Sequence, residues 1–136
     1  GGMIEGHRLA AFLPGGASGG MLPAAMADAP LGFGSLDAYG CFVGSGAVVV
    51  LSDHDNALDA TRNLLHFFAE ESCGQCTPCR VGTEKLLALT GAGQWDVPLL
   101  DEIAQAMADA SICGLGQAAA NPLKSLLRFF PEQASK

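Results

Sequence analysis

Four of the five cysteines are spaced so that they could hold a metal centre. Cys73, Cys76 and Cys79 are separated from one another by two residues each, and Cys113 lies 34 positions after Cys79 in a second glycine-rich turn. Three thiolates from one tight loop and a fourth from a distant turn are typical ligands of a cubane iron–sulfur cluster. Gly74 would let the loop bend around such a cluster. We therefore predict that these four cysteines bind one cluster and join two parts of the fold.

Three other uses of these cysteines compete with this interpretation. Structural zinc usually takes its ligands as two pairs, which a triplet plus a single cysteine fits less well. Cys76-Thr77-Pro78-Cys79 has the C-x-x-C pattern of a thioredoxin-type dithiol, but that interpretation leaves Cys73 and Cys113 without a role. A disulfide framework is not expected from such dense local spacing without a signal peptide.

Composition limits the possible classes of protein. The 136 residues are 49% hydrophobic, enough for one domain or two small ones with a core. The net charge of −7 argues against a nucleic acid or an anionic membrane as partner. No apolar run approaches the length of a transmembrane helix, so we expect no direct membrane insertion. Thiols kept as ligands imply a reducing compartment, hence the cytoplasm or the cytoplasmic face of a membrane complex.

The first half of the chain, residues 1–52, is rich in glycine and poor in charge. It predicts a small α+β unit with a strand, a glycine-rich loop, two short elements and a second, buried strand. The expected ranges in chain order are 7–13 for the strand, 14–20 for the loop, 22–29 for a short helix, 36–39 for another short element and 47–51 for the buried strand.

The pattern of the second half, residues 53–136, predicts four short helices. We expect them at about 55–70, at 81–90, from the cap at Asp96 to the Cys113 turn, and at 123–130. Ser52 or Asp53 could cap the first helix and Asp96 the third. Buried faces are expected at Leu58, Thr61, Leu65 and Phe68 in the first helix and at Leu99, Ile103 and Met107 in the third.

Helices joined by short connections favour a four-helix bundle. The three-cysteine loop lies between the first two helices and Cys113 lies between the last two. In an up-down-up-down bundle these two connections lie at the same end. The predicted topology therefore brings all four thiols together.

Two segments carry a resemblance to a known family. Ser72 to Arg80 (SCGQCTPCR) and Ser111 to Pro122 (SICGLGQAAANP) closely resemble the C-terminal part of the flavoprotein, NADH-binding subunit of respiratory complex I. They also resemble the β subunits of NAD-dependent molybdenum formate dehydrogenases and the diaphorase subunits of NAD-reducing hydrogenases. Residues 12–18 and 44–50 look like the soluble-ligand-binding β-grasp (SLBB) domain of that family. Residues 14–20 and 39–51 are most similar to the formate dehydrogenase branch.

The resemblance implies a fold, a cofactor and partners. It implies an SLBB-like β-grasp domain at 1–52 and a four-helix domain at 53–136 that carries a [4Fe–4S] cluster. It assigns the ligands to Cys73, Cys76, Cys79 and Cys113. The cluster would exchange single electrons with a flavin mononucleotide, which exchanges hydride with NAD. Both sites are expected in an upstream domain of the same subunit that this chain lacks, with other iron–sulfur subunits as further partners. Alone, the chain should carry electrons but not oxidise NADH.

Several other residues are given structural roles. The Gly114–Ala119 segment matches a dinucleotide fingerprint but follows a helix, so we expect a turn that lets the backbone approach the cluster. Cys41 is expected to be a buried, inert thiol, His66 to be partly buried packing, and Trp95 to be a packing anchor. The three histidines show no metal-ligand spacing. Arg80 adjoins a ligand and could stabilise the reduced cluster, whereas Arg62, Lys85 and Lys124 are interpreted as surface charge.

Two rival functions remain open from the sequence. One is a zinc-stabilised interaction module with no redox role. The other is a β-grasp ligand binder whose helical half is only structural.

Overall fold

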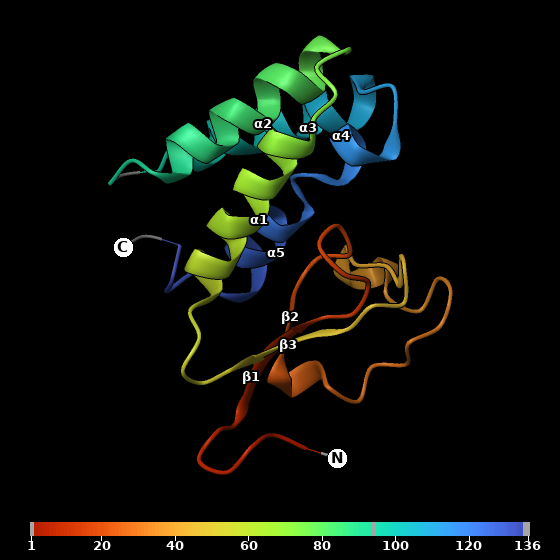
Figure 1. Cartoon of the computed structure of the whole chain (residues 1–136), viewed down its shortest axis with the longest axis vertical. Helices are drawn as coiled ribbons and strands as arrows, with labels where there is room; N and C mark the ends of the chain where they lie inside the picture. Colours follow the sequence, from red (N-terminus) through yellow and green to blue (C-terminus); the bar gives the residue numbers. More distant parts are fainter. Residues whose placement is uncertain (1, 94, 135–136) are drawn as a thin grey trace.

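The computed structural model describes residues 2–93 and 95–134. It has the predicted α+β class, with a small sheet from the first part of the chain and a group of helices from the second. Figure 1 shows the sheet below and the helices above, with the start of α1 and the helix α5 nearest to the sheet. No helix among the described residues is long and apolar enough to cross a membrane.

The sheet has three antiparallel strands in the order β2-β1-β3. The central strand β1 (Leu9–Leu13) lies within the predicted range of 7–13. It pairs with the two-residue strand β2 (Leu22–Pro23) on one side and with β3 (Val49–Ser52) on the other. A register shift between Leu9 and Ala11 interrupts the pairing of β1 with β3.

The predicted helix at 22–29 is wrong. Leu22 and Pro23 pair with β1 instead, and only one 3₁₀ turn, η1 (Ala24–Met26), follows. The backbone of Leu22 is thus used by the sheet, and only Ala24–Met26 of the six residues left before Pro30 are helical. The short element expected at 36–39 is a second 3₁₀ turn, η2 (Asp37–Tyr39).

The strand expected to be buried at 47–51 is an exposed edge strand. Val48, Val49 and Val50 keep 48%, 43% and 48% of their surface accessible. β3 lies at the edge of the sheet and pairs with β1 alone, and its valines are not part of the described hydrophobic clusters. A β-branched run indicates a strand but does not by itself indicate burial.

Five α-helices follow, four of which correspond to the predicted ones. They are α1 (Ala57–Glu71), α2 (Thr77–Thr90), α3 (Val97–Ala110), α4 (Gly114–Ala118) and α5 (Asn121–Phe129). The predicted N-cap of α1 is wrong, because the Asn56 side chain accepts hydrogen bonds from Leu58 N at 2.8 Å and Asp59 N at 3.1 Å. Asp96 caps α3 as predicted, through Leu99 N at 3.1 Å.

The predicted buried face of α1 is confirmed, since Leu58, Thr61, Leu65 and Phe68 are all buried. That of α3 is partly wrong. Leu100, Ala104 and Met107 face the core, whereas Leu99 is 38% exposed. Residues 100, 104 and 107 follow the helical repeat and share one face. Leu99 precedes Leu100 by one position and is therefore rotated by about 100° away from that face.

The sheet and the helices pack on each other. Met21 N donates to Ser125 Oγ at 3.0 Å, and Asn121 Nδ2 donates to the carbonyl of Ser18 at 2.9 Å. One hydrophobic cluster contains residues of β1, α1 and α5. Trp95 packs against this cluster and against the helical core, as predicted. The glycine-rich loop and β2 are therefore held directly against α5.

Candidate iron–sulfur site

The three-cysteine loop is shorter than predicted because α2 begins inside it. The helix starts at Thr77 rather than at Val81, with Cys76 as its N-cap residue and Cys79 in its first turn. Pro78 near the helix start explains the early beginning, because proline is favourable in the first turn. Gly74 has φ +76°, the left-handed conformation that turns the chain between Cys73 and Cys76.

The distant cysteine is presented by a second break between helices. α3 ends at Ala110, and Ser111 follows in an extended conformation. Cys113, also extended, directly precedes the single helical turn α4, which was not predicted from the sequence. Five residues with two glycines give almost no helical periodicity to detect.

These two breaks meet at the same end of the helices, as the bundle topology predicted. All four predicted cysteines line one cavity of about 100 Å³. Its remaining lining residues are Glu71, Ser72, Gln75 and Leu115. The donor set suits an iron–sulfur cluster, because thiolates are the ligands that such clusters require and the cavity contains four.

The four thiols differ in their exposure. Cys79 is buried at 4% exposure and Cys76 is half-buried, whereas Cys73 and Cys113 are exposed. Ile112, next to Cys113, is 78% exposed. The cavity therefore has a buried wall formed by α2 and an open side at which Cys73 and Cys113 lie.

The thiols also affect one another's ionisation. Burial raises the pKa of Cys79, the Ser72 hydroxyl opposes this rise, and the charges of Cys76, Cys113 and Cys73 add to it. The pKa of Cys76 is lowered, chiefly by the backbone N–H of Ile112. Thiols that repel one another in this way favour a bound cation that neutralises them together.

α4 lies against the start of α2 at a glycine. A Cβ atom at Gly116 would lie 2.8 Å from the Cys79 Cβ and 2.4 Å from the Ser111 Oγ. A Cβ atom at Gly114, by contrast, would have no other atom within 4 Å. The Gly114–Ala119 segment thus allows a close helix contact beside the cysteines, as expected. It has no preceding strand, which a dinucleotide fingerprint requires.

Arg80 supports the loop rather than the cavity. Its guanidinium donates to the carbonyl of Gly74 and lies 3.4 Å from the Thr77 Oγ1. Neither Arg80 nor any of Arg62, Lys85 and Lys124 is among the residues that line the cavity. Arg80 therefore ties the first turn of α2 back to the glycine of the cysteine loop.

Cys41 lies apart from the site. It is 2% exposed and packs with Phe12, Leu22 and Leu36. Burial raises the pKa of its thiol. The predicted burial of Cys41 is confirmed.

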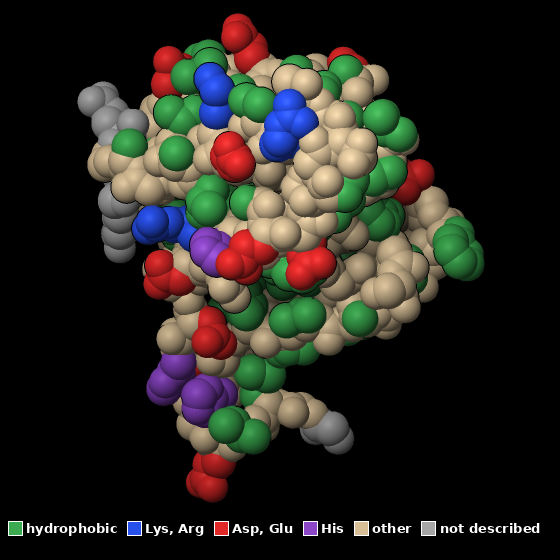
Figure 2. Space-filling view, turned by 45° about the horizontal axis from the view of Figure 1, so that its top comes forward, with side chains coloured by type: hydrophobic (Ala, Val, Ile, Leu, Met, Phe, Trp, Pro, Cys, Tyr) green, Lys and Arg blue, Asp and Glu red, His purple; other side chains and the backbone are tan. Residues whose placement is uncertain are grey.

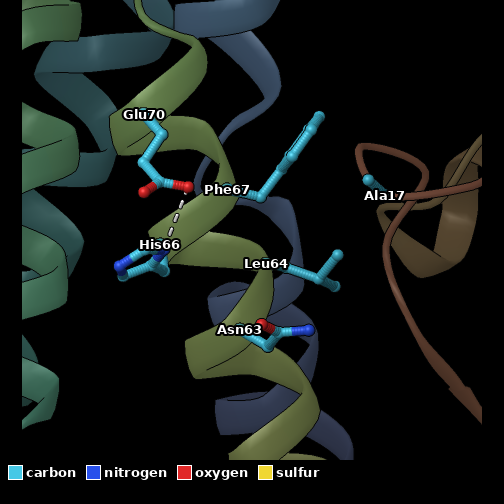
Figure 3. Close-up of a pocket in the computed structure, with 6 residues that line it drawn as sticks. All are labelled: Ala17, Asn63, Leu64, His66, Phe67 and Glu70. Carbon is cyan, nitrogen blue, oxygen red and sulfur yellow. Dashed lines mark ion pairs between the residues drawn. The ribbon is translucent and has the colours of Figure 1, made fainter.

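The prediction that His66 is partly buried is wrong. Its side chain is exposed and its Nδ1 lies 3.3 Å from the Glu70 Oε2. Both residues line a hollow of about 360 Å³ between α1 and the glycine-rich loop. In Figure 3 Leu64 and Phe67 point from α1 toward Ala17, while His66 and Glu70 pair along the helix.

The structure also gathers three groups from two distant parts of the chain. One ligand atom from each of His7, Asp53 and His54 lies within 4.8 Å of the others, and the two imidazole rings stack at 4.2 Å. Spacing along the chain could not reveal this group, because His7 and His54 are brought together only by the pairing of β1 with β3.

Acidic side chains are spread over the surface shown in Figure 2 rather than gathered in one patch. The negative net charge of the chain therefore does not indicate a separate binding site on this face.

Known proteins resemble this chain over most of its length. Residues 59–136 match the family described as the NADH-ubiquinone oxidoreductase-F iron-sulfur binding region. The F subunit of the Streptomyces coelicolor NADH-quinone oxidoreductase is 38% identical over 98% of this chain. The HndC subunit of the NADP-reducing hydrogenase of Solidesulfovibrio fructosivorans is 33% identical over 98% of it. The chain spans only 31% and 28% of the lengths of these two relatives.

Solved structures show the same similarity. The NAD⁺-reducing [NiFe]-hydrogenase in its H₂-reduced state matches 94% of this chain with a TM-score of 0.82 and 33% identity, and the match covers 23% of that hydrogenase chain. Its air-oxidized state matches with a TM-score of 0.80 and 34% identity. The chain therefore belongs to the family of NADH-ubiquinone oxidoreductase-F iron-sulfur binding regions, and its cofactor is a [4Fe–4S] cluster.

Proposed function

We propose that this chain relays single electrons through a [4Fe–4S] cluster held by Cys73, Cys76, Cys79 and Cys113. The observation that carries this proposal is the meeting of all four thiols at one cavity. When bound, the cluster supplies a centre that gains and loses one electron. The family match favours this function over a zinc-stabilised interaction module.

The chain's own residues hold the ligands in place. Cys76 and Cys79 lie at the N-terminus of the 14-residue helix α2, whose positive dipole end stabilises thiolate charge. Arg80 fixes the bend at Gly74. The packing of α4 against α2 through Gly116 keeps the Cys113 turn beside the loop. The two ligand-bearing segments are thus positioned by different helices.

The electron partners are proposed from the names of the relatives. One relative is a subunit of an NADH-quinone oxidoreductase and the other is a subunit of an NADP-reducing hydrogenase, so both are parts of nicotinamide-linked enzymes. We therefore place the NAD site in the rest of the subunit, together with the flavin that the family resemblance implies, and further clusters in other subunits. Cys73, Cys113 and Ile112 are exposed, which leaves one side of the cavity open toward such partners. Membership of the formate dehydrogenase branch stays a prediction.

Two further assignments belong to this proposal. Residues 1–52 would be the SLBB-like domain and residues 53–136 the cluster-binding domain. The location would be the cytoplasm or the cytoplasmic face of a membrane complex, because cysteines kept as metal ligands require a reducing compartment.

The test compares two cysteine variants of the anaerobically prepared chain. The wild-type chain should contain iron and acid-labile sulfide in equal amounts and should be reducible by one electron. Cys113→Ser should lose most of both, whereas Cys41→Ala, which removes a thiol outside the cavity, should retain them. Full iron and sulfide in Cys113→Ser would contradict the ligand assignment. Zinc without sulfide in the wild-type chain would contradict the relay itself.

Removing the metal provides a second readout. Thiolate ligation would join the α1–α2 loop to the turn before α4, so iron chelation should lower the melting temperature and broaden the transition of the helical part. Equal melting curves with and without metal would contradict this.

A further inference from the structure

Ser111 has a buried hydroxyl with no hydrogen-bond partner among the described residues. The residue is 6% exposed and lies two positions before Cys113. A buried hydroxyl left without a partner costs roughly 1–3 kcal/mol, so native structures rarely keep one without a reason. The hydroxyl is therefore available for a group that the chain itself does not supply.

The backbone of Ser111 is firmly held. Its N–H donates to the carbonyl of Met107 at 3.1 Å, and its carbonyl accepts from the Gln117 Nε2 at 3.0 Å. Both bonds fix the residue between the end of α3 and the turn α4. The side chain is thus the one part of Ser111 whose polar group is not used.

The side chain lies beside Cys79 of α2. The Ser111 Oγ and the Cys79 Cβ flank the same point, since a Cβ atom built on Gly116 would lie 2.4 Å from the first and 2.8 Å from the second. The oxygen therefore lies beside Cys79, next to the residues that line the cysteine cavity.

A second serine at the site behaves differently. The Ser72 Oγ lies 3.4 Å from the Cys79 Sγ and also accepts from Gly74 N at 3.4 Å. The Ser72 hydroxyl thus has partners within the chain, whereas that of Ser111 has none among the described residues.

We propose that, when the cluster is bound, the Ser111 hydroxyl donates a hydrogen bond to a sulfur of the cluster beside Cys79, and that this bond raises the reduction potential of the cluster. The inference rests on the proposed ligand assignment. Adding one electron increases the negative charge on the sulfurs, and a donor aimed at a sulfur stabilises the reduced form more than the oxidised form. Reduction of the cluster adds one electron, which dithionite supplies in the test, and no covalent bond forms or breaks.

The test is a potentiometric titration of the loaded chain followed by electron paramagnetic resonance. Ser111→Ala should keep its iron and sulfide but be harder to reduce. We expect a decrease of up to about tenfold in the equilibrium constant for reduction, which is about 59 mV for a one-electron couple. An unchanged potential in a fully loaded Ser111→Ala chain would overturn the proposal and leave the ligand assignment intact.

Thr61→Val is the matched control. Thr61 Oγ1 is the other buried side-chain atom without a partner among the described residues, and it lies on α1 outside the cavity. Its removal should leave the potential unchanged. A shift equal to that of Ser111→Ala would show that loss of any buried hydroxyl changes the potential, and would overturn the proposal.

If Ser111→Ala does not bind a cluster, the melting temperature of the metal-free variant tests the proposal instead. If the hydroxyl acts only on the bound centre, the metal-free variant should melt at the wild-type temperature or above it, because an unused buried hydroxyl has been removed. A lower melting temperature would show that Ser111 is a packing residue and would overturn the proposal. Wild-type protein without iron and sulfide would instead refute the proposed function.

Discussion

The contact of α4 with α2 allows a sharp test at Gly116. Replacing Gly116 by alanine places a Cβ atom 2.4 Å from the Ser111 Oγ, 2.6 Å from the Ser111 Cβ and 2.8 Å from the Cys79 Cβ. Side-chain atoms almost never approach so closely. Ser111 is held by two backbone hydrogen bonds and Cys79 lies in a helix, so neither can move away easily.

The expected magnitude follows from two opposing terms. Overpacking of this kind costs about 1–3 kcal/mol. Alanine is favoured over glycine in a helix by up to about 1 kcal/mol. Gly114 lies on the same helical turn, and the methyl group added by Gly114→Ala has no atom within 4 Å. Gly114→Ala therefore gains only the helix preference for alanine and causes no overpacking. Gly116→Ala should therefore be less stable than Gly114→Ala by about 1–3 kcal/mol.

The assay is urea denaturation of both anaerobic variants, followed by circular dichroism, with the iron content measured in parallel. We expect Gly116→Ala to have the lower midpoint and the lower iron content, because the clash is shared by a proposed ligand. If both variants had the same midpoint and the same iron content, the close contact of α4 with α2 would be refuted.

Three further predictions concern the loop, the cap of α1 and acid. Gly74→Ala and Gly46→Ala place alanine at φ near +76° and +73°, at a cost of about 1–2 kcal/mol each. Only Gly74→Ala should lower the iron content per protein, because only Gly74 lies in the cysteine loop. Asn56→Ala should lower the free energy of unfolding by about 1 kcal/mol in urea, since the cap bonds to Leu58 and Asp59 are lost; a loss of only a few tenths would contradict that role. The pKa of Asp55 is lowered, first by the backbone N–H of Ser52 and then by the hydroxyl of Ser52. The Asp55 carboxylate therefore stabilises the fold above its unfolded pKa of about 3.9. This stabilisation is lost as the pH falls through the lower pKa of the folded state. The melting temperatures of wild type and Asp55→Ala should therefore differ at pH 7 and converge toward pH 2, and a constant difference would contradict this.

Local patterns predicted much of the helical half because they report local physics. The apolar repeat of α1 at Leu58, Leu65 and Phe68 and the Asp96 cap of α3 depend on residues within a few positions of each other. Two of the errors arose where tertiary contacts override such patterns. Leu22 pairs with β1 rather than starting a helix, and the apolar Val48–Val50 run lies at an edge of the sheet.

The sequence alone indicated a metal site, because the number and spacing of Cys73, Cys76, Cys79 and Cys113 favour an iron–sulfur cluster over zinc. Only the tertiary structure decided which thiols are buried, that Arg80 ties the loop, and that Ser111 and Gly116 lie against Cys79. The last two contacts join the start of α2 to the turns after α3, more than 30 positions apart, and they depend on how the helices pack. Spacing along a chain carries no information about such packing, whereas the exposure and hydrogen bonding of each ligand depend on it.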